Sequence, residues 1–239
     1  MTIHIHTYGF GQSLVFFHGW GFDHHIWRVL LPNLMSHYQL HLIDLPGFGG
    51  TPPLSWEDFK NELLERLPDK FVVIGWSLGG LMATRLALEA SDRVTHLINI
   101  ASSPRFVREK DWPGIDANVL DDFYRNLQTN PLQLLKEFLN LQLKGEALPD
   151  MFEQPPNLIG LQKGLDILIN WDLRPQLVTL KMPAFYLFGR LDTITPQKVM
   201  KKMQQYFPNF QYQLFERAAH APFLSHKDQF IEALTGFLT

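Results

Sequence analysis

The sequence contains no cysteine among its 239 residues. Without cysteine there can be no disulfide framework, no thiolate metal site, no redox pair and no cysteine nucleophile. Any catalytic chemistry must therefore come from serine, histidine, aspartate, glutamate, lysine or tyrosine side chains. Histidine is present in ten copies, so the main question is which histidine has a chemical role.

The sequence also lacks a surplus of positive charge and any long hydrophobic run. Its net charge is −3 and its isoelectric point is near 6.3, so no basic field points to nucleic acid or to an anionic membrane. The longest apolar runs, such as Leu14–Phe17, are far too short to span a bilayer. Residues 1–11 show neither the basic start nor the apolar segment of a signal peptide. We therefore expect a cytoplasmic protein with no nucleic-acid or membrane partner.

Apolar residues make up 46% of the chain, which is enough for a large core. Thr2–Thr7 alternates polar and apolar residues, as a half-exposed edge strand does. Nearly continuous apolar runs, typical of strands buried on both faces, follow at Leu14–Phe17, Leu40–Ile43, Phe71–Ile74 and Val94–Ile100. Helical patterns lie between them at Ile26–Met35, Trp56–Leu67 and Leu78–Ala90. This order predicts an α/β fold with a mostly parallel central sheet and flanking helices.

The strand signal disappears between Pro104 and Pro175. Three amphipathic helical stripes occupy this segment, at Val119–Leu127, Leu134–Leu141 and Leu158–Ile169. Strands return at Ala184–Phe188 and Gln211–Phe215, with helices at Pro196–Phe207 and His226–Leu238. We predict a core made of residues 1–103 and 176–239, with residues 104–175 inserted as a helical lid. A separate helical domain is the alternative, but both ends of the segment lead directly back into sheet elements.

The sharpest local motif is a G-x-S-x-G pentapeptide, Gly75-Trp76-Ser77-Leu78-Gly79. It follows the predicted strand Phe71–Ile74 and opens a predicted helix, which is the setting of a nucleophile elbow. In such a turn the glycines avoid a clash between strand and helix, and the serine is held in a strained conformation. The alternatives are a plain glycine-rich turn and a phosphate-binding loop, but the lysine of a P-loop is missing. We predict that Ser77 is a nucleophile.

A serine nucleophile needs a base to take its proton, and the base needs an orienting group. His220 stands among small residues in the loop Ala218-Ala219-His220-Ala221-Pro222, which leaves room for a reacting group. We predict that His220 is the base. His4 and His6 are expected on a solvent face of the first strand. Five further histidines have no clear chemical neighbour and are assigned surface or packing roles: His24, His25, His37, His41 and His96. Ser225, three residues before Asp228, is predicted to cap the last helix.

The orienting acid is predicted to be Asp192, which follows the predicted strand Ala184–Phe188. Thr195 and Pro196 already supply the start of the next helix, so Asp192 has no evident capping role. The resulting chain order, Ser77, Asp192, His220, is that of α/β-hydrolases and differs from the order in trypsin-like or subtilisin-like proteases.

A tetrahedral acyl intermediate needs N–H donors for its negatively charged oxygen. One predicted donor is the backbone N–H of Leu78, at the start of the helix after Ser77. The other is the N–H of Trp20, in the loop His18-Gly19-Trp20-Gly21, which His18 is expected to brace by hydrogen bonding. The segment Asp44–Gly50 lacks the glycine spacing of a dinucleotide site and is interpreted as a tight turn after a strand.

These motifs together resemble the α/β-hydrolase family along essentially the whole chain. The H-G-W-G loop, the D-x-P-G-x-G turn, the G-W-S-L-G-G elbow, the G-x-x-D loop and the final A-H-A-P-F occur in the family's order. With Ser102-Ser103-Pro104 and Asp111-Trp112-Pro113-Gly114-Ile115, they resemble most closely the pimeloyl-[acyl-carrier protein] methyl ester esterases of biotin synthesis. The resemblance implies a serine carboxylesterase acting on that ester. We expect a monomer that requires no metal and no cofactor.

The same resemblance implies which residues contact the substrate. They are the tryptophan of the H-G-W-G loop, the Ser-Leu pair of the elbow, a segment of the lid and the catalytic histidine. The matching positions are Trp20, Ser77, Leu78, Phe138, Leu139, Asn140, Leu141, Gln142 and His220. Ordinary helix packing is the alternative for Phe138–Leu141.

An acyl carrier protein is acidic, and the resemblance implies a basic lid surface to receive it. Between Pro104 and Asp172 the sequence has seven basic and eleven acidic residues, a net charge of −4. Such a lid attracts an acidic partner only if the basic residues gather on one face. The alternatives within the same fold are a broad short-acyl esterase, a thioesterase, a C–C hydrolase with the same residues, or a small-molecule receptor.

Overall fold

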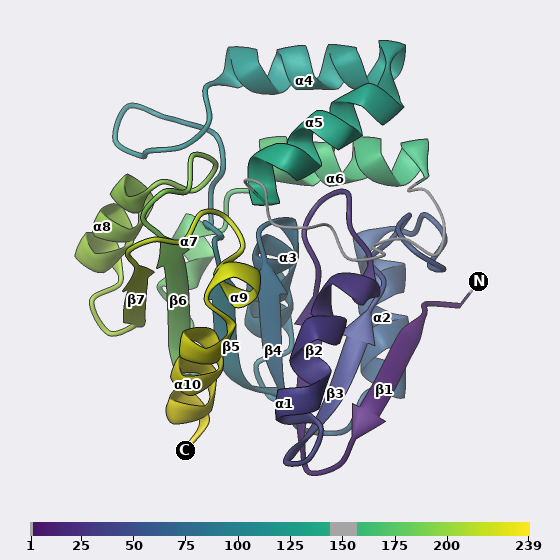
Figure 1. The fold of residues 1–239 in the computed structure, drawn as a ribbon, viewed down its shortest axis with the longest axis vertical. Coiled ribbons are helices and arrows are strands. Elements are labelled where there is room, and N and C mark those ends of the chain that lie inside the picture. Colours follow the sequence, from purple (N-terminus) through teal and green to yellow (C-terminus); the bar gives the residue numbers. More distant parts are fainter. Residues whose placement is uncertain (1, 144–156) are drawn as a thin grey trace.

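The computed structural model describes residues 2–143 and 157–239. Seven strands of this part of the chain form one sheet with the order β1-β3-β2-β4-β5-β6-β7 (Figure 1). The strands are β1 (Ile5–Gly9), β2 (Gln12–Phe17), β3 (Tyr38–Ile43), β4 (Phe71–Trp76), β5 (Val94–Ile100), β6 (Ala184–Gly189) and β7 (Gln211–Phe215). Only the β1–β3 pair is antiparallel within this sheet. The prediction of an α/β fold with a mostly parallel sheet is therefore confirmed.

The edge strand begins later than the alternation of Thr2–Thr7 predicted. The backbone N–H groups of Ile3 and His4 donate to side chains, to Glu62 Oε1 at 2.7 Å and Thr51 Oγ1 at 2.8 Å. These donors are therefore satisfied without strand pairing, and β1 starts at Ile5.

Helices cover both faces of the sheet, as Figure 1 shows. α2 (Trp56–Arg66), α3 (Leu78–Glu89) and α7 (Arg174–Leu177) lie behind the strands, whereas α1 (Leu31–Leu34), α9 (Pro222–Ser225) and α10 (Lys227–Leu238) lie in front. α8 (Gln197–Tyr206) lies beside β6 and β7. The predicted helix Ile26–Met35 is instead a 3-10 helix, η1 (His24–Leu30), followed by α1. Pro32, which has no N–H to donate, stands at the start of α1 and separates the two.

Two predicted helix caps have different outcomes. Ser55 caps α2, because its Oγ accepts the N–H of Asp58 at 3.1 Å. The predicted cap at Ser225 is wrong: α10 begins after His226 with no side-chain cap. The Ser225 hydroxyl is within 2.9 Å of His226 Nδ1 and donates to the Ala221 carbonyl in the preceding turn, at 3.4 Å.

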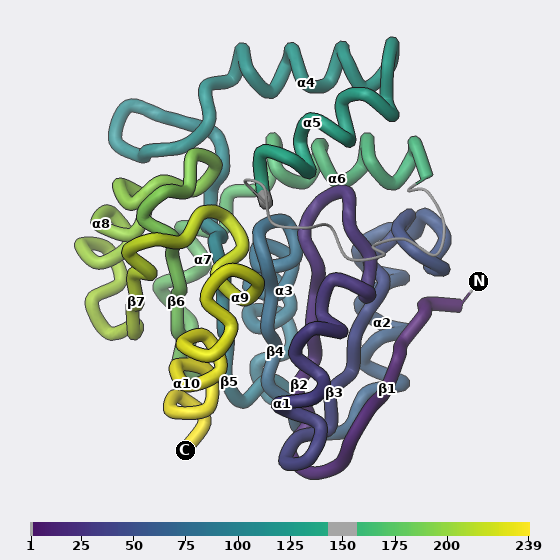
Figure 2. The backbone as a smooth tube through the Cα atoms, viewed as in Figure 1, coloured from purple at the N-terminus to yellow at the C-terminus, as the bar shows by residue number. Residues whose placement is uncertain are grey.

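A helical insertion stands over the carboxyl ends of the central strands. It contains α4 (Ala117–Thr129), α5 (Pro131–Leu143) and α6 (Leu158–Asn170), and Figure 2 shows the chain leaving the core after β5 and returning before β6. Within residues 104–143 and 157–175 the only β pairing is two isolated bridges. The lid helices are therefore confirmed, while the division into residues 1–103, 104–175 and 176–239 stays a prediction. Lys144, Glu146, Asp150 and Glu153 of the lid lie outside the described residues. No helix in the described part of the chain is long and apolar enough to cross a membrane.

Candidate active site

The turn between β4 and α3 has the geometry of a nucleophile elbow. Ser77 has φ 54° and ψ −117°, a conformation that costs a non-glycine residue free energy. A Cβ on Gly75 would lie 2.3 Å from the Gly79 carbonyl oxygen, and one on Gly79 would lie 2.3 Å from that of Phe17. Strand, turn and helix are therefore packed too closely for any side chain at either glycine, as the motif predicts.

The backbone of the elbow is held by the segment that follows β5. The N–H of Ser77 donates to the Ile100 carbonyl at 2.9 Å, and the Ser102 hydroxyl donates to the Ser77 carbonyl at 2.8 Å. Ala101 between them also has a positive φ of 46°. This role of Ser102 was not predictable from the sequence, because the contact spans 25 residues and leaves no local pattern.

His220 and Asp192 form a buried pair. The Nδ1–H of His220 donates to Asp192 Oδ2 at 2.7 Å, which sets the imidazole tautomer with Nε2 unprotonated. Within the described chain, Nε2 has no hydrogen-bond partner. This nitrogen is therefore able to accept a proton.

The carboxylate of Asp192 also holds its own loop. It accepts the N–H groups of Ile194 and Thr195 at 2.8 Å and 3.0 Å, and the Thr195 hydroxyl at 2.5 Å. Burial alone would raise the pKa of Asp192, but His220 and the Thr195 hydrogen bonds lower it overall. The predicted Thr195 cap is wrong, because α8 has no side-chain cap and the Thr195 hydroxyl faces Asp192 instead.

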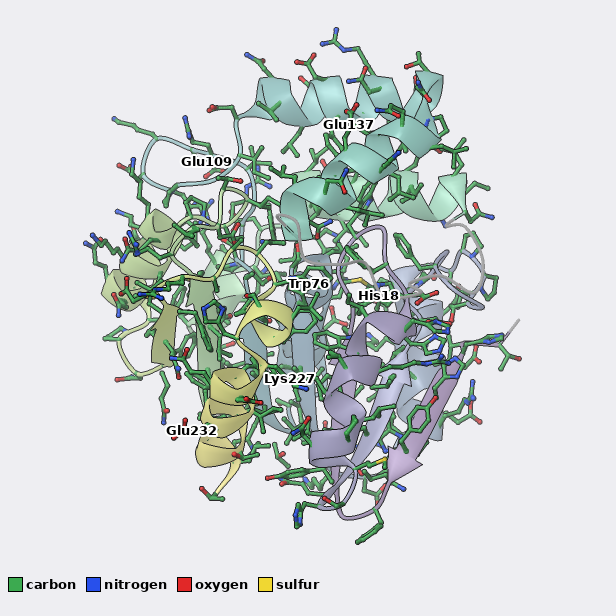
Figure 3. The ribbon with its side chains drawn as sticks, in the orientation of Figure 1. His18, Trp76, Glu109, Glu137, Lys227 and Glu232 are labelled. Atoms are coloured by element: carbon green, nitrogen blue, oxygen red, sulfur yellow. The ribbon has the colours of Figure 1, made fainter. Side chains whose placement is uncertain are left out.

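Trp76 connects the histidine loop to the elbow. Its indole N–H donates to the His220 carbonyl at 2.8 Å, and its ring packs against Phe22 and Phe223. Because Trp76 directly precedes Ser77, this bond brings the His220 loop next to the serine. Figure 3 labels Trp76 beneath the lid helices.

The predicted oxyanion donors lie on two braced segments. Leu78 is the first residue of α3, so its N–H has no partner within the helix. His18 braces the other loop as predicted: its Nδ1–H donates to the Gly19 carbonyl at 2.8 Å, and its Nε2 accepts the Leu45 N–H at 3.0 Å. Burial lowers the pKa of His18, so the ring stays neutral and keeps both bonds. Figure 3 labels His18 at this edge of the sheet.

The lid contacts the Trp20 loop directly. The indole N–H of Trp20 donates to the Leu161 carbonyl of α6 at 2.8 Å, and the Gln142 amide donates to the Trp20 carbonyl at 3.5 Å. The Trp20 ring packs edge-on against Phe138 and Phe123. The position of the lid helices is therefore coupled to the loop that carries a predicted oxyanion donor.

An apolar cavity of about 130 Å³ opens onto the serine. It is lined by Ser77, Phe106, Ile115, Val119, Leu120, Phe123, Phe138, Leu141, Leu165, Leu168, Thr193 and Ile194. Of the predicted lid contacts, Phe138 and Leu141 line this cavity. Leu139 and Gln142 are buried, with Gln142 supporting Trp20. Asn140 is exposed and lines no described cavity.

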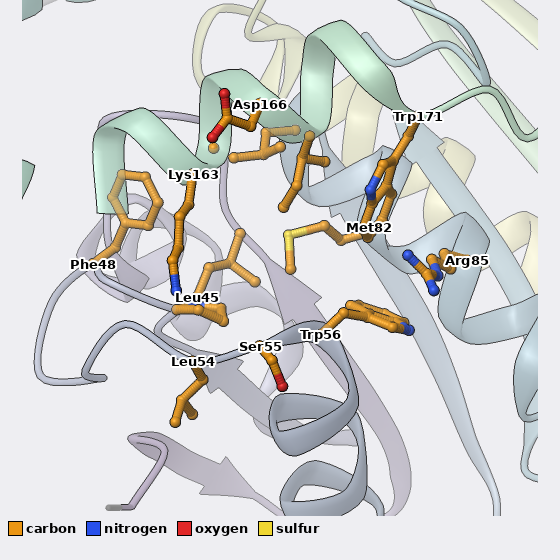
Figure 4. A pocket seen from close by; sticks show the side chains of 14 residues that line it. Leu45, Phe48, Leu54, Ser55, Trp56, Met82, Arg85, Lys163, Asp166 and Trp171 are labelled. Atoms are coloured by element: carbon orange, nitrogen blue, oxygen red, sulfur yellow. The ribbon is translucent and has the colours of Figure 1, made fainter. Parts of the chain in front are cut away.

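A larger cavity of about 290 Å³ lies between α6 and α2, and Figure 4 shows the side chains that line it. Arg85 lies over the rings of Trp56 and Trp171, at 5.0 Å and 4.4 Å from their centroids. Its serine, Ser55, is occupied in capping α2. Ser77 does not line this larger cavity. We therefore assign ester hydrolysis to the smaller cavity, which Ser77 does line.

The histidines near the N-terminus have partners that sequence reasoning missed. His24 donates to Asp44 at 2.8 Å, and the ring of His6 stacks on that of His24 with centroids 3.5 Å apart. His25 similarly lies 3.0 Å from Asp23. The prediction that His24 and His25 have no chemical neighbour is wrong: Asp44 reaches His24 from 20 residues away, and Asp23 is only two residues from His25.

Two groups in the described chain could hold a metal ion: His4 with His6 and Asp44, and Asp23 with His24 and His25. The carboxylate of Asp44 already accepts N–H groups from His24 and Gly50 at 2.9 Å each. Neither group lines the cavity at Ser77.

Comparisons with known proteins agree with this geometry. Residues 12–227 match the family model of the alpha/beta hydrolase fold. The chain is 53% identical over 238 residues to the pimeloyl-[acyl-carrier protein] methyl ester esterase of Legionella pneumophila (strain Corby), with 100% of both chains covered. It is 40% identical to the esterase of the same name from Aliivibrio salmonicida (strain LFI1238), covering 99% of this chain and 96% of that one.

A solved structure shares the fold. The esterase EaEST from Exiguobacterium antarcticum superposes with a TM-score of 0.87 at 21% identity, covering 98% of this chain and 94% of that one. The fold, the elbow and the full-length identity thus lead to one assignment. The chain belongs to the α/β-hydrolase family and, within it, to the family of pimeloyl-[acyl-carrier protein] methyl ester esterases.

Proposed function

We propose that the protein is a serine carboxylesterase that hydrolyses the methyl ester of pimeloyl-[acyl-carrier protein], releasing pimeloyl-[acyl-carrier protein] and methanol. The observation that carries the proposal is the strained Ser77, which lines an apolar cavity, together with the buried His220–Asp192 pair, whose loop is bonded to the residue before Ser77 through the Trp76 indole. The full-length identity to esterases of that name supports the substrate.

The proposed catalytic cycle assigns one role to each of these residues. His220 Nε2 takes the proton of the Ser77 hydroxyl as its oxygen attacks the ester carbonyl. The backbone N–H groups of Trp20 and Leu78 bind the resulting oxyanion. Asp192 holds the imidazole tautomer and stabilises the imidazolium form. His220 then protonates the departing methoxide, and a water molecule repeats the sequence on the acyl-enzyme to release the acid.

The cavity suits a chain of methylene groups with an uncharged end. Its lining contains no charged side chain, and burying an unpaired carboxylate there would be costly. A methyl ester enters such a site without that cost, whereas the free acid product leaves it. Phe138 and Leu141 are proposed to contact the acyl chain, and Leu139 and Gln142 to support the Trp20 loop. The contact at Asn140, the monomeric state and the cytoplasmic location stay predictions.

Complementation tests the biological role. A biotin auxotroph that lacks its own pimeloyl ester esterase should grow without biotin when it expresses the wild-type chain. The Ser77→Ala variant, expressed at the same level, should not restore growth. Growth with Ser77→Ala, or no growth with a wild-type chain that hydrolyses p-nitrophenyl esters, would contradict the proposed substrate.

A further inference from the structure

Two histidines at the start of the edge strand β1 lie beside the aspartate that follows β3 (Figure 1). His4 and His6 are two residues apart, so an extended backbone points both side chains to the same face of the sheet. The Asp44 N–H donates to the His4 carbonyl at 3.1 Å, which fixes the aspartate beside them. One ligand atom from each of the three side chains lies within 4.8 Å of the others.

The Asp44 carboxylate has one acceptor position that no described group uses. A carboxylate offers about four lone-pair positions. Its Oδ1 accepts the backbone N–H and the Nδ1–H of His24, at 2.9 Å and 2.8 Å, and its Oδ2 accepts the Gly50 N–H at 2.9 Å. Burial alone would raise the pKa of Asp44, but the bonds from His24 and Gly50 lower it overall. The carboxylate is therefore charged, with one lone pair of Oδ2 still available.

The distance between His6 and this oxygen fits a shared ion better than a hydrogen bond. His6 Nε2 lies 3.7 Å from Asp44 Oδ2, which is too long for a hydrogen bond. This nitrogen is nevertheless buried, and it has no hydrogen-bond partner among the described residues. Two ligand atoms at about 2.0–2.2 Å from a tetrahedral ion lie roughly 3.3–3.6 Å apart. The two atoms are thus close to the separation that a bridging ion requires.

The surrounding residues hold both histidine rings in place. The ring of His6 is stacked on that of His24 with an interplanar angle of 14°, and His24 is itself bonded to Asp44. A Cβ on Gly50 would lie 2.2 Å from His4 Nδ1, so the absence of a side chain at position 50 leaves room for the His4 ring. His4 is exposed, which gives an ion access from solvent. Such support of the ligands by neighbouring groups is typical of metal sites.

The second candidate group, Asp23 with His24 and His25, is less suited to an ion. The Nδ1 atoms of both histidines are already engaged in hydrogen bonds, His24 with Asp44 at 2.8 Å and His25 with Asp23 at 3.0 Å. His25 therefore provides a control position for the first group, because it lies near the same cluster without belonging to it.

We propose that His4, His6 and Asp44 bind a divalent transition-metal ion such as Zn²⁺, with water completing its coordination. Two imidazole nitrogens and one carboxylate oxygen suit this class of ion better than Mg²⁺ or Ca²⁺, which prefer oxygen ligands alone. The ion takes no part in the proposed ester hydrolysis, because none of the three ligands lines the cavity at Ser77. Its role is to join the start of β1 to the turn after β3.

The test is a calorimetric titration of the full chain, prepared without a histidine tag and stripped with a chelator, with ZnCl₂. The wild type should bind one equivalent of Zn²⁺ saturably. His4→Asn and His6→Asn should each weaken binding by at least about tenfold, since loss of even an outer partner of a ligand costs about 10- to 100-fold. With free Zn²⁺ about a hundredfold above its dissociation constant, the melting temperature of the wild type should rise by about 5–10 °C.

Two variants serve as matched controls. His25→Gln alters the neighbouring group, and His37→Asn removes an exposed histidine outside both groups; both should bind Zn²⁺ as the wild type does. Mg²⁺ at the same concentration should leave the melting temperature of the wild type unchanged. If His6→Asn does not fold, His4→Asn decides the question, because the His4 side chain is exposed.

The assignment would be overturned by wild-type protein that shows no saturable binding of Zn²⁺, or by His4→Asn and His6→Asn variants that bind as tightly as wild type. An equal loss of binding in either control, or an equal rise in melting temperature with Mg²⁺, would overturn it as well. Hydrolysis of a p-nitrophenyl ester should be the same in His4→Asn as in wild type. Loss of esterase function with intact Zn²⁺ binding would therefore refute only the proposed function.

Discussion

The buried His18 side chain makes the stability of the folded protein depend on pH. Burial lowers its pKa below the ordinary value of 6.5, so the folded protein keeps the ring neutral where the unfolded chain binds a proton. Its contribution to stability is therefore complete above pH 6.5 and is lost as the pH falls from 6.5 through the folded-state pKa.

The His18→Gln variant should lack this pH-dependent contribution. The difference in unfolding free energy between wild type and variant should shrink as the pH falls from 7.5 to 5, with a slope of at most about 1.4 kcal/mol per pH unit. Denaturant unfolding at a series of pH values measures the difference. A difference that stays constant, or grows toward low pH, would show that His18 is protonated in the folded protein.

We predict that catalysis depends on the negative charge of Asp192. In Asp192→Asn the loop N–H groups of Ile194 and Thr195 keep an acceptor, but the amide favours the wrong imidazole tautomer at His220. We expect kcat for a p-nitrophenyl ester to fall by about 10⁴-fold, with the melting temperature little changed. Asp228→Asn, at the start of α10, serves as the control and should keep wild-type kcat. Wild-type activity in the Asp192→Asn variant would show that Asp192 has no part in the mechanism.

Residue types and chain order were sufficient to predict Ser77, Asp192 and His220 as candidates, because a nucleophile elbow has a local signature. The residues that support them were not predictable in this way. Thr195 was interpreted as a helix cap, and its hydroxyl instead donates to Asp192. Ser102 and Trp76 act through contacts with distant segments. Such contacts depend on how the elements meet in space, which local patterns do not encode.

At the scale of elements, the lid helix α6 is positioned by backbone contact. A Cβ on Gly160 would lie 2.3 Å from the Gly47 carbonyl oxygen, and the next residue, Leu161, accepts the Trp20 indole N–H. A side chain at position 160 must therefore push α6 away from the Trp20 loop.

Gly160→Ala should destabilise the protein and impair catalysis together. Alanine favours helix by about 1 kcal/mol, but the overpacking costs about 1–3 kcal/mol, so a net loss of up to about 2 kcal/mol is expected. kcat should fall because the oxyanion donor at Trp20 moves with the helix. Lys163→Ala, exposed on the same helix, is the control for both measurements. Equal kcat in the two variants would show that α6 does not position Trp20.

The bounds of strands were predicted well where a strand is buried on both faces, because such a strand is a continuous apolar run in the sequence. β5 has the bounds that its apolar run predicted, and β2, β3 and β4 extend the predicted runs by only a few residues. The errors fall where side chains replace the expected backbone partners, at Ile3 and His4, and where Pro32 divides a helical pattern. Amphipathic stripes predicted the lid helices, but not which of their residues would face the cavity.

At the scale of the whole molecule, the parallel sheet explains why the proposed site draws its residues from distant segments. Ser77 follows β4, Asp192 follows β6 and His220 follows β7, and the carboxyl ends of these parallel strands meet at one edge. The lid covers that edge (Figure 1).

Hydrolysis of pimeloyl-[acyl-carrier protein] methyl ester by wild type and Ser77→Ala, followed by mass spectrometry of the carrier, tests most directly whether Ser77 acts on this ester. The wild type should convert many equivalents of ester to free acid, and Ser77→Ala should be slower by about 10⁴- to 10⁶-fold while melting at a similar temperature. Conversion by Ser77→Ala at a rate near that of wild type, or none by the wild type, would contradict the assignment.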